Sequence, residues 1–178
     1  MDDEILREEE EIADERALEA ARFGAGMAKR PIRSLTTLKP LVWVSPAASV
    51  RAAAKVMDDG GVGCVLVVEA ERLVGIFTER DVLGKVVAGG RDPETTTVRD
   101  VMTPDPECLT LDDAVGYALN LMSDHGFRRI PLIDAAGRPT GVVTMRNIVV
   151  NLVELIPSDV RNLPPRPTLQ NTREREGA

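Results

Sequence analysis

The sequence predicts an α+β fold in which two copies of one repeat pack with pseudo-twofold symmetry, preceded by an N-terminal helix. Three observations support this prediction. The same residues recur 65 or 66 positions later in the chain, which is the signature of an internal repeat. Within each copy, a segment with helical periodicity is followed by two short apolar runs that suit strands. One copy is too short to close a core by itself, so the two copies are expected to pack sheet against sheet.

Residues 1–31 are expected to form an acidic helical extension. Residues 1–20 contain ten acidic side chains and only two basic ones, and the apolar stripe along them is thin. Two interpretations remain open: a solvated segment, or a helix that docks on the repeats or on a second subunit. Gly24 and Pro31 mark the end of the extension.

The repeat is defined by pairs of matching residues. Three pairs lie 65 positions apart: Val50 and Val115, Met57 and Met122, Gly61 and Gly126. After one inserted residue, three more lie 66 apart: Gly75 and Gly141, Thr78 and Thr144, Asp81 and Asn147. So regular a spacing indicates that both copies share one fold.

Each copy reads as helix, strand, strand, helix. The first helix has a small apolar face and ends at glycine: Val50, Ala53, Ala54 and Met57 before Gly60 in one copy, Val115, Ala118, Leu119 and Met122 before Gly126 in the other. The strands are expected at 64–68 and 73–78, and at 130–133 and 140–144. Thr78 and Thr144 are good N-cap residues for the closing helices.

Composition excludes several classes of function. The net charge of −7 disfavours nucleic-acid binding, which needs a basic surface. One histidine, and two cysteines without a CxxC motif, suggest neither a metal site nor a disulfide framework. The charged N-terminus and the absence of an apolar run of ~20 residues predict a cytoplasmic protein outside the membrane. No nucleophile–base pair or phosphate loop is present, so no enzyme activity is expected. Residues 157–178, with four prolines, are expected to form a Pro-rich charged tail.

Four motifs resemble a tandem pair of cystathionine-β-synthase (CBS) domains, also called a Bateman module. They are GIFTERD at 75–81, VRDVMTPDPECLTLDDAV at 98–115, RRIPLID at 128–134 and GVVTMRN at 141–147. The resemblance implies two repeats of β-α-β-β-α type, which we expect at 35–96 and 97–156. It also implies a homodimer, and a regulatory module that binds AMP, ADP, ATP or S-adenosylmethionine as ligand without catalysis.

The stronger expected site is centred on Thr78 and Asp81. Thr78 stands where a strand turns into a helix, so its hydroxyl and nearby N–H groups are placed to face phosphate, whereas Asp81 is placed to accept ribose hydroxyls. The alternative is a plain helix cap. The resemblance implies that this cleft is shared with the other copy, and we expect it to include Ile76, Arg80, Thr103, Glu107, Cys108, Arg128, Arg129, Ile130 and Pro131. Arg128 and Arg129 are candidates for a phosphate clamp, or else solvated charges on a strand edge.

The equivalent second cleft is expected to be weaker. It would be formed by Leu38, Gly63, Cys64, Val65, Thr144, Arg146 and Asn147. Asn147 replaces the aspartate and cannot form charge-assisted bonds to ribose, and Gly63 and Cys64 replace the two arginines. The sequence therefore predicts one good nucleotide site and one weak site. The alternative function is a structural dimerisation platform without a physiological nucleotide, with the acidic N-terminal helix as the element that binds a protein partner.

Overall fold

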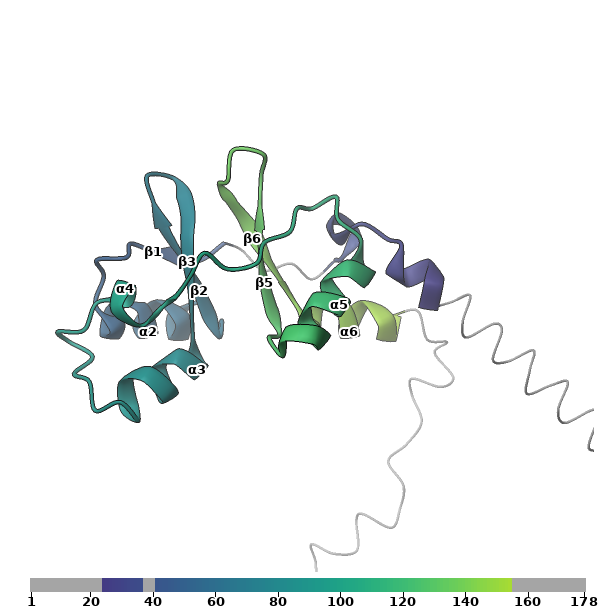
Figure 1. Ribbon diagram of the computed structural model, residues 1–178. Coiled ribbons are helices and arrows are strands. Elements are labelled where there is room, and N and C mark those ends of the chain that lie inside the picture. Colours follow the sequence, from purple (N-terminus) through teal and green to yellow (C-terminus); the bar gives the residue numbers. More distant parts are fainter. Residues whose placement is uncertain (1–23, 37–40, 155–178) are drawn as a thin grey trace, which may run out of the picture.

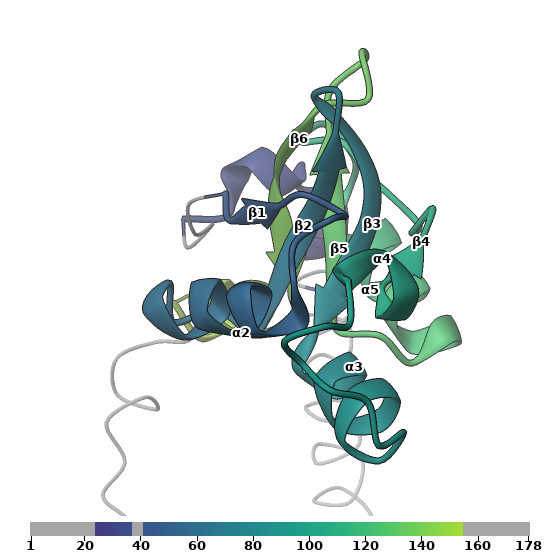
Figure 2. The same cartoon turned by 90° about the vertical axis from the view of Figure 1, so that its left-hand side faces the viewer.

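The computed structural model describes residues 24–36 and 41–154. It confirms the expected α+β architecture with two repeats. In Figure 1 the first repeat lies on the left and the second on the right, their sheets face each other in the centre, and the helices lie to the outside. Figure 2, viewed from the side of the first repeat, shows its strands in front of the second sheet.

The first repeat has the predicted order of elements. Strand β1 (Trp43–Val44) precedes helix α2 (Val50–Asp59), and the hairpin of β2 (Cys64–Glu69) and β3 (Arg72–Thr78) follows. The closing helix consists of α3 (Glu79–Asp81) and a π-helical continuation, η2 (Val82–Val87). The sheet has the order β1-β2-β3-β4, and its last strand, β4 (Thr103–Pro104), comes from the segment that enters the second repeat.

The second repeat follows the same plan. Helices α4 (Val98–Val101) and α5 (Val115–His125) precede strands β5 (Arg129–Ile133) and β6 (Pro139–Thr144), and helix α6 (Met145–Glu154) closes it. Leu109 forms a parallel bridge with Leu132, which corresponds to the pairing of Val44 with Val67 in the first repeat.

Local chemistry explains these boundaries. The hydroxyl of Ser49 accepts a hydrogen bond from the Ala52 amide and caps α2. Gly126, at a φ of 70°, ends α5 in the left-handed conformation that glycine adopts without strain. Among the described residues, no helix is long and apolar enough to cross a membrane.

Strand β2 is apolar throughout because both of its faces are covered. Val65 and Val67 point into the helix-covered core of the first repeat. Cys64 and Leu66 point the other way, into a cluster between the sheets. Val142 of the second repeat packs against that cluster. The continuous run CVLVV is therefore the pattern of a strand buried on both faces rather than of a half-exposed one.

The segment that enters each repeat completes the core of the other repeat. Backbone hydrogen bonds join the short helix η1 (Ile32–Ser34) to the second repeat, and the Ile32 amide donates to the Asp113 carbonyl at 2.9 Å. Conversely, the Val98 amide donates to the Ala48 carbonyl of the first repeat at 2.9 Å. Ile32 and Val98 are both fully buried, each in the opposite core. The expected boundaries of 35–96 and 97–156 stay predictions, since each entry segment adjoins one repeat in sequence and packs in the other.

The end of the N-terminal extension docks on the second repeat. Residues 24–28 are helical and Met27 is buried in the second core. A Cβ atom added at Gly116 on α5 would lie 2.9 Å from the Ala28 Cβ, so the glycine allows this close approach. The docking interpretation therefore holds for residues 24–31. Residues 1–23 of the expected extension and the tail at 157–178 lie outside the described residues.

Replacing Ile32 tests the exchange of entry segments. We expect Ile32→Ala to lower the free energy of unfolding by about 2–5 kcal/mol, because the side chain fills a core that cannot readily collapse. Chemical denaturation measures the loss. The control is Arg33→Ala at the next residue, whose ion pair with Asp112 is exposed on both sides and is worth less than about 1 kcal/mol. An Ile32→Ala loss no larger than that of the control would contradict a role for this segment in the core.

Candidate functional site

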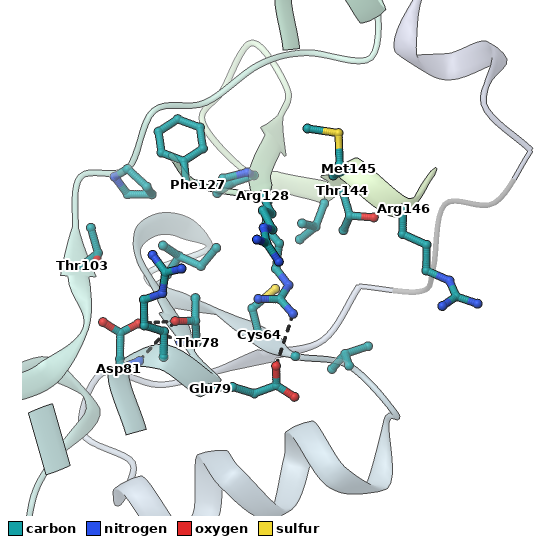
Figure 3. A pocket seen from close by; sticks show the side chains of 18 of the residues that line it. Cys64, Thr78, Glu79, Asp81, Thr103, Phe127, Arg128, Thr144, Met145 and Arg146 are labelled. Atoms are coloured by element: carbon teal, nitrogen blue, oxygen red, sulfur yellow. Dashed lines mark hydrogen bonds and ion pairs between the residues drawn. The ribbon is translucent and has the colours of Figure 1, made fainter. Parts of the chain in front are cut away.

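A large cavity lies between the two repeats, at the ends of β3 and β6 that carry Thr78 and Thr144. Its volume is about 1640 Å³. Figure 3 shows Thr78, Glu79 and Asp81 of the first repeat on one side, and Arg128 and Thr144 of the second repeat opposite. Ligand pockets commonly measure about 300–1,000 Å³. The two clefts expected from the sequence therefore join into one continuous space.

Thr78 and Asp81 form a reciprocal cap at the start of the closing helix. The amide and the hydroxyl of Thr78 donate to Asp81 Oδ2 at 2.9 and 2.7 Å, and the Asp81 amide donates back to the Thr78 Oγ1 at 3.3 Å. Asp81 is only 8% exposed, so its carboxylate is fixed by these bonds at the cavity wall. The plain-cap interpretation is thus true of the local geometry, and a ligand would meet a carboxylate that is already oriented.

Lys85 fixes the second oxygen of the same carboxylate. Its Nζ lies 2.7 Å from Asp81 Oδ1 and donates to the carbonyls of Val101 and Met102 at 2.9 and 3.3 Å. These carbonyls directly precede Thr103. Thr103 is the first residue of the segment entering the second repeat that lines the cavity. One ammonium group therefore joins the candidate ribose-binding carboxylate to the segment that crosses the cavity.

The second repeat reproduces this geometry without the charge. Thr144 donates from its amide and its hydroxyl to Asn147 Oδ1 at 2.8 and 2.6 Å. Asn151 stands 66 residues after Lys85, and its Oδ1 accepts a hydrogen bond from the Thr36 amide at 3.3 Å. The backbone is matched in the two repeats, and the difference between the two halves of the cavity is chemical.

Arg129 crosses from the second repeat to the first. Its Nη2 lies 3.3 Å from Oε2 of Glu79, and this ion pair spans the cavity. The pair runs over Gly63, where an added Cβ would lie 2.5 Å from the Glu79 oxygen and closer still to the Arg129 guanidinium. The glycine that replaces an arginine in the first repeat thus provides the space that the Arg129 side chain occupies.

Arg128 is exposed, and no ion pair to it is present within residues 24–36 and 41–154. Its side chain extends into the cavity in Figure 3. Of the two candidates for a phosphate clamp, Arg128 is therefore available to a ligand, whereas Arg129 is already paired with a carboxylate.

Most residues expected at the site do line this cavity. From the first group these are Ile76, Thr78, Arg80, Asp81, Thr103, Glu107, Arg128, Arg129 and Pro131; from the second, Gly63, Cys64, Thr144, Arg146 and Asn147. The structure places Ile130 and Val65 in the two helix-covered cores instead, both fully buried. The cause is strand alternation, because their neighbours Pro131 and Cys64 take the opposite face.

Cys108 lies apart from the cavity. It lines a separate space of about 250 Å³ with Arg72 at the start of β3 and Gly137 from the turn of the second hairpin. Its thiol is 3.0 Å from the Pro106 carbonyl, to which it donates. Leu38 lies outside the described residues.

The cavity also contains residues that the sequence did not single out. They include Val42, Glu79, Asp105, Phe127, Val142, Met145 and Val150. Glu79 is the important addition, and the only signal for it was its place between Thr78 and Asp81 in the GIFTERD motif. With it, four acidic and four arginine side chains line the cavity, so their formal charges balance.

Neither thiol has the properties of a reactive nucleophile. Burial raises the pKa of Cys64, and nearby Arg129 only partly offsets this effect. Burial also raises the pKa of Cys108. In the part of the chain that the structure describes, no group of three or more His, Cys, Asp or Glu side chains is arranged to hold a metal ion.

Comparison with known sequences gives one family. The model of the CBS domain matches twice, at residues 32–88 and 98–154. An uncharacterized 17.7 kDa protein of Acidianus ambivalens is 34% identical over 70% of this chain and 74% of its own length. The CBS domain-containing protein CBSCBSPB3 of Arabidopsis thaliana is 34% identical over 68% of this chain. The match spans 22% of the length of CBSCBSPB3. It also spans less than half of the length of another relative, the uncharacterized protein MK0525 of Methanopyrus kandleri.

Comparison with solved structures agrees on the fold. A putative signal-transduction protein with CBS domains from Burkholderia ambifaria is 28% identical and matches with a TM-score of 0.63, over 67% of this chain and 87% of its own. The crystal structure of CBSX2 in complex with AMP is 25% identical and matches with a TM-score of 0.59, over 70% of this chain and 96% of its own.

Proposed function

The chain belongs to the CBS domain family, and we propose that its two repeats form a regulatory module that binds an adenosine nucleotide in the cavity between them. The observation that carries this proposal is the fixed Asp81 carboxylate, which faces a cavity shared by both repeats. A ligand in such a place contacts both repeats at once. Its binding therefore favours whichever relative arrangement of the repeats fits it best.

Asp81 is suited to recognise a ribose. An ionised carboxylate has about four sites that accept hydrogen bonds, and Thr78 and Lys85 use only some of them. The amide and the hydroxyl of Thr78 and the Nζ of Lys85 occupy three of these sites, so the remaining site can accept one ribose hydroxyl. Because the carboxylate is held in place before binding, little side-chain entropy is lost when the sugar arrives.

The rest of the cavity supplies contacts for the base and for the phosphate. Ile76, Pro131 and Val142 give an apolar wall for adenine, and Arg128 is positioned to bind a phosphate. The crystal structure of CBSX2 contains AMP, and this chain matches most of that protein. These features support AMP as the first ligand to test, with ADP, ATP and S-adenosylmethionine as the other candidates.

We expect the second half of the cavity to bind nucleotide weakly. Asn147 presents a neutral amide in the place of Asp81, and Arg146 lies on the far side of the cavity from Asp81 in Figure 3. Charge-assisted hydrogen bonds are about twice as strong as neutral ones, so the ribose is held better at Asp81.

Calorimetric titration with AMP tests this proposal. We expect one dominant site per chain, and we expect Asp81→Ala to weaken it by at least about tenfold, the loss of one charge-assisted hydrogen bond. The matched control is Asp100→Ala. Asp100 forms the same cap with Thr97, with bonds of 3.2 and 2.6 Å, but it lies outside the cavity. Two AMP sites of equal affinity, neither of them weakened by Asp81→Ala, would contradict the proposal.

A homodimer is the second part of the proposal. Each repeat ends in a helix with two exposed apolar side chains at equivalent positions: Leu83 and Val87 on η2, and Val149 and Val153 on α6. Both closing helices lie in the lower half of the molecule in Figure 1, the one that begins with α3 below the first sheet and α6 beside the lower end of the second. Repeated exposure of apolar side chains on one side of a molecule is typical of an interaction surface. A second copy, related by a twofold axis, would cover both helices at once.

Sedimentation velocity tests the dimer. We expect wild-type protein to sediment as a dimer, and the double variant Leu83→Glu, Val149→Glu as a monomer with an unchanged circular dichroism spectrum. Tyr117→Glu is the control, because Tyr117 is also exposed but lies on α5. A dimer that survives the double variant would contradict the proposed surface.

The alternative function is a dimerisation platform without a nucleotide. It would leave the proposed dimer surface intact and the cavity without a ligand, so the two experiments together separate it from the sensor. A protein partner that binds the acidic N-terminal helix, and a cytoplasmic location, stay predictions.

A further inference from the structure

Resting on the proposed function, we propose that Glu79 determines how much negative charge the bound adenosine ligand can carry. By pairing with Arg129, Glu79 makes the cavity prefer adenosine ligands with one phosphate or none over ADP and ATP. Glu79 is then a specificity-determining residue of the nucleotide site.

The position of Glu79 places its charge beside the candidate ribose anchor. It directly follows Thr78 and stands two residues before Asp81, and its side chain lines the same cavity. Arg129, a candidate ligand for phosphate, reaches Glu79, so a phosphate held by Arg129 lies beside this carboxylate. Glu79 therefore meets the phosphate end of the ligand rather than a distant part of the surface.

The ion pair with Glu79 engages Arg129, one of the two arginines that are candidates for a phosphate clamp. Arg129 Nη2 lies 3.3 Å from Glu79 Oε2, and the Arg129 side chain is 32% exposed. The Glu79 side chain is 65% exposed, and a phosphate can use Arg129 only by sharing it with this carboxylate or by displacing the carboxylate into solvent. Sharing brings phosphate and carboxylate charges of the same sign together, and displacement costs the ion pair between Arg129 and Glu79.

The other groups near the anchor do not compensate for this cost. The amide and the hydroxyl of Thr78 already donate to Asp81, and the Glu79 amide donates to the Gly63 carbonyl at 3.2 Å. Asp105 and Glu107 add two more carboxylates to the cavity wall. One phosphate finds a counter-charge in Arg128. On the side formed by the first repeat and the crossing segment, Arg80 is the one arginine of the described lining, against the carboxylates of Glu79, Asp81, Asp105 and Glu107, so a further phosphate there meets mainly like charge. Discrimination against polyphosphates thus comes from an unfavourable contact with the wrong ligand.

Titrations of adenosine, AMP and ATP test the role of Glu79. They are made without divalent cations, at fixed ionic strength, on wild-type protein and on Glu79→Gln. We expect wild-type protein to bind AMP more tightly than ATP. Glu79→Gln should raise the affinity for ATP relative to adenosine by about tenfold, as expected when a like charge beside the ligand is removed. The affinity for adenosine, which has no phosphate, should change little.

Two further variants make the test specific. Glu69→Gln also removes one carboxylate from an ion pair with an arginine, here Arg99 at 2.6 Å, but both residues lie outside the cavity. It should leave the ratio of ATP to adenosine affinity unchanged. If Glu79 acts through Arg129, the gain in ATP affinity should be lost in the double variant Glu79→Gln, Arg129→Gln. A gain that persists in the double variant would contradict the part assigned to Arg129.

The outcomes separate this inference from the proposed function. Wild-type protein and Glu79→Gln could both bind adenosine and AMP and show the same ratio of ATP affinity to adenosine affinity. In that case Glu79 does not determine specificity, while the proposed nucleotide-binding module stands. Tighter binding of ATP than of AMP by wild-type protein overturns the inference in the same way. If neither protein binds any of the three ligands, the inference and the proposed function both fail.

Discussion

Each repeat lacks part of its own hydrophobic core, and the entry segment of the other repeat supplies it. Ile32 is buried beside α5 of the second repeat, and Val98 is buried in the core of the first. The exchange holds the sheets face to face and leads the chain across the space between them. The cavity depends on this constraint, because Thr78 and Asp81 come from one repeat, Arg128 and Arg129 from the other, and Thr103 from the crossing segment.

The two halves of the cavity have the same backbone and different chemistry. Asp81 with Lys85 in the first repeat corresponds to Asn147 with Asn151 in the second, and each set fixes the start of a closing helix. The candidate ribose-binding carboxylate is therefore present once, although the fold offers the position twice. The ion pair over Gly63 breaks the symmetry again, since only the second repeat contributes an arginine there.

The repeat spacing was enough to predict the main helix, the hairpin strands and the start of the closing helix in each copy, because a residue such as Thr78 marks the same turn in any copy of the pattern. The residues that face Thr78 from the other copy were expected from the resemblance to the CBS family. Three features could not be read from it. The exchange of Ile32 depends on contacts with residues such as Asp113, far along the chain. Which neighbour faces the cavity, Pro131 or Ile130, depends on strand phase. The role proposed for Glu79 rests on its contact with Arg129, which reaches it from the other repeat.

We propose that a symmetric fold carries one strong adenosine site per chain, and native mass spectrometry of the protein titrated with AMP is the decisive experiment. We expect one AMP per chain to bind first, and a second to bind only at much higher concentration, because the Asn147 side of the cavity is neutral. Binding of two AMP molecules per chain with equal affinity, or of none at any concentration, would contradict it.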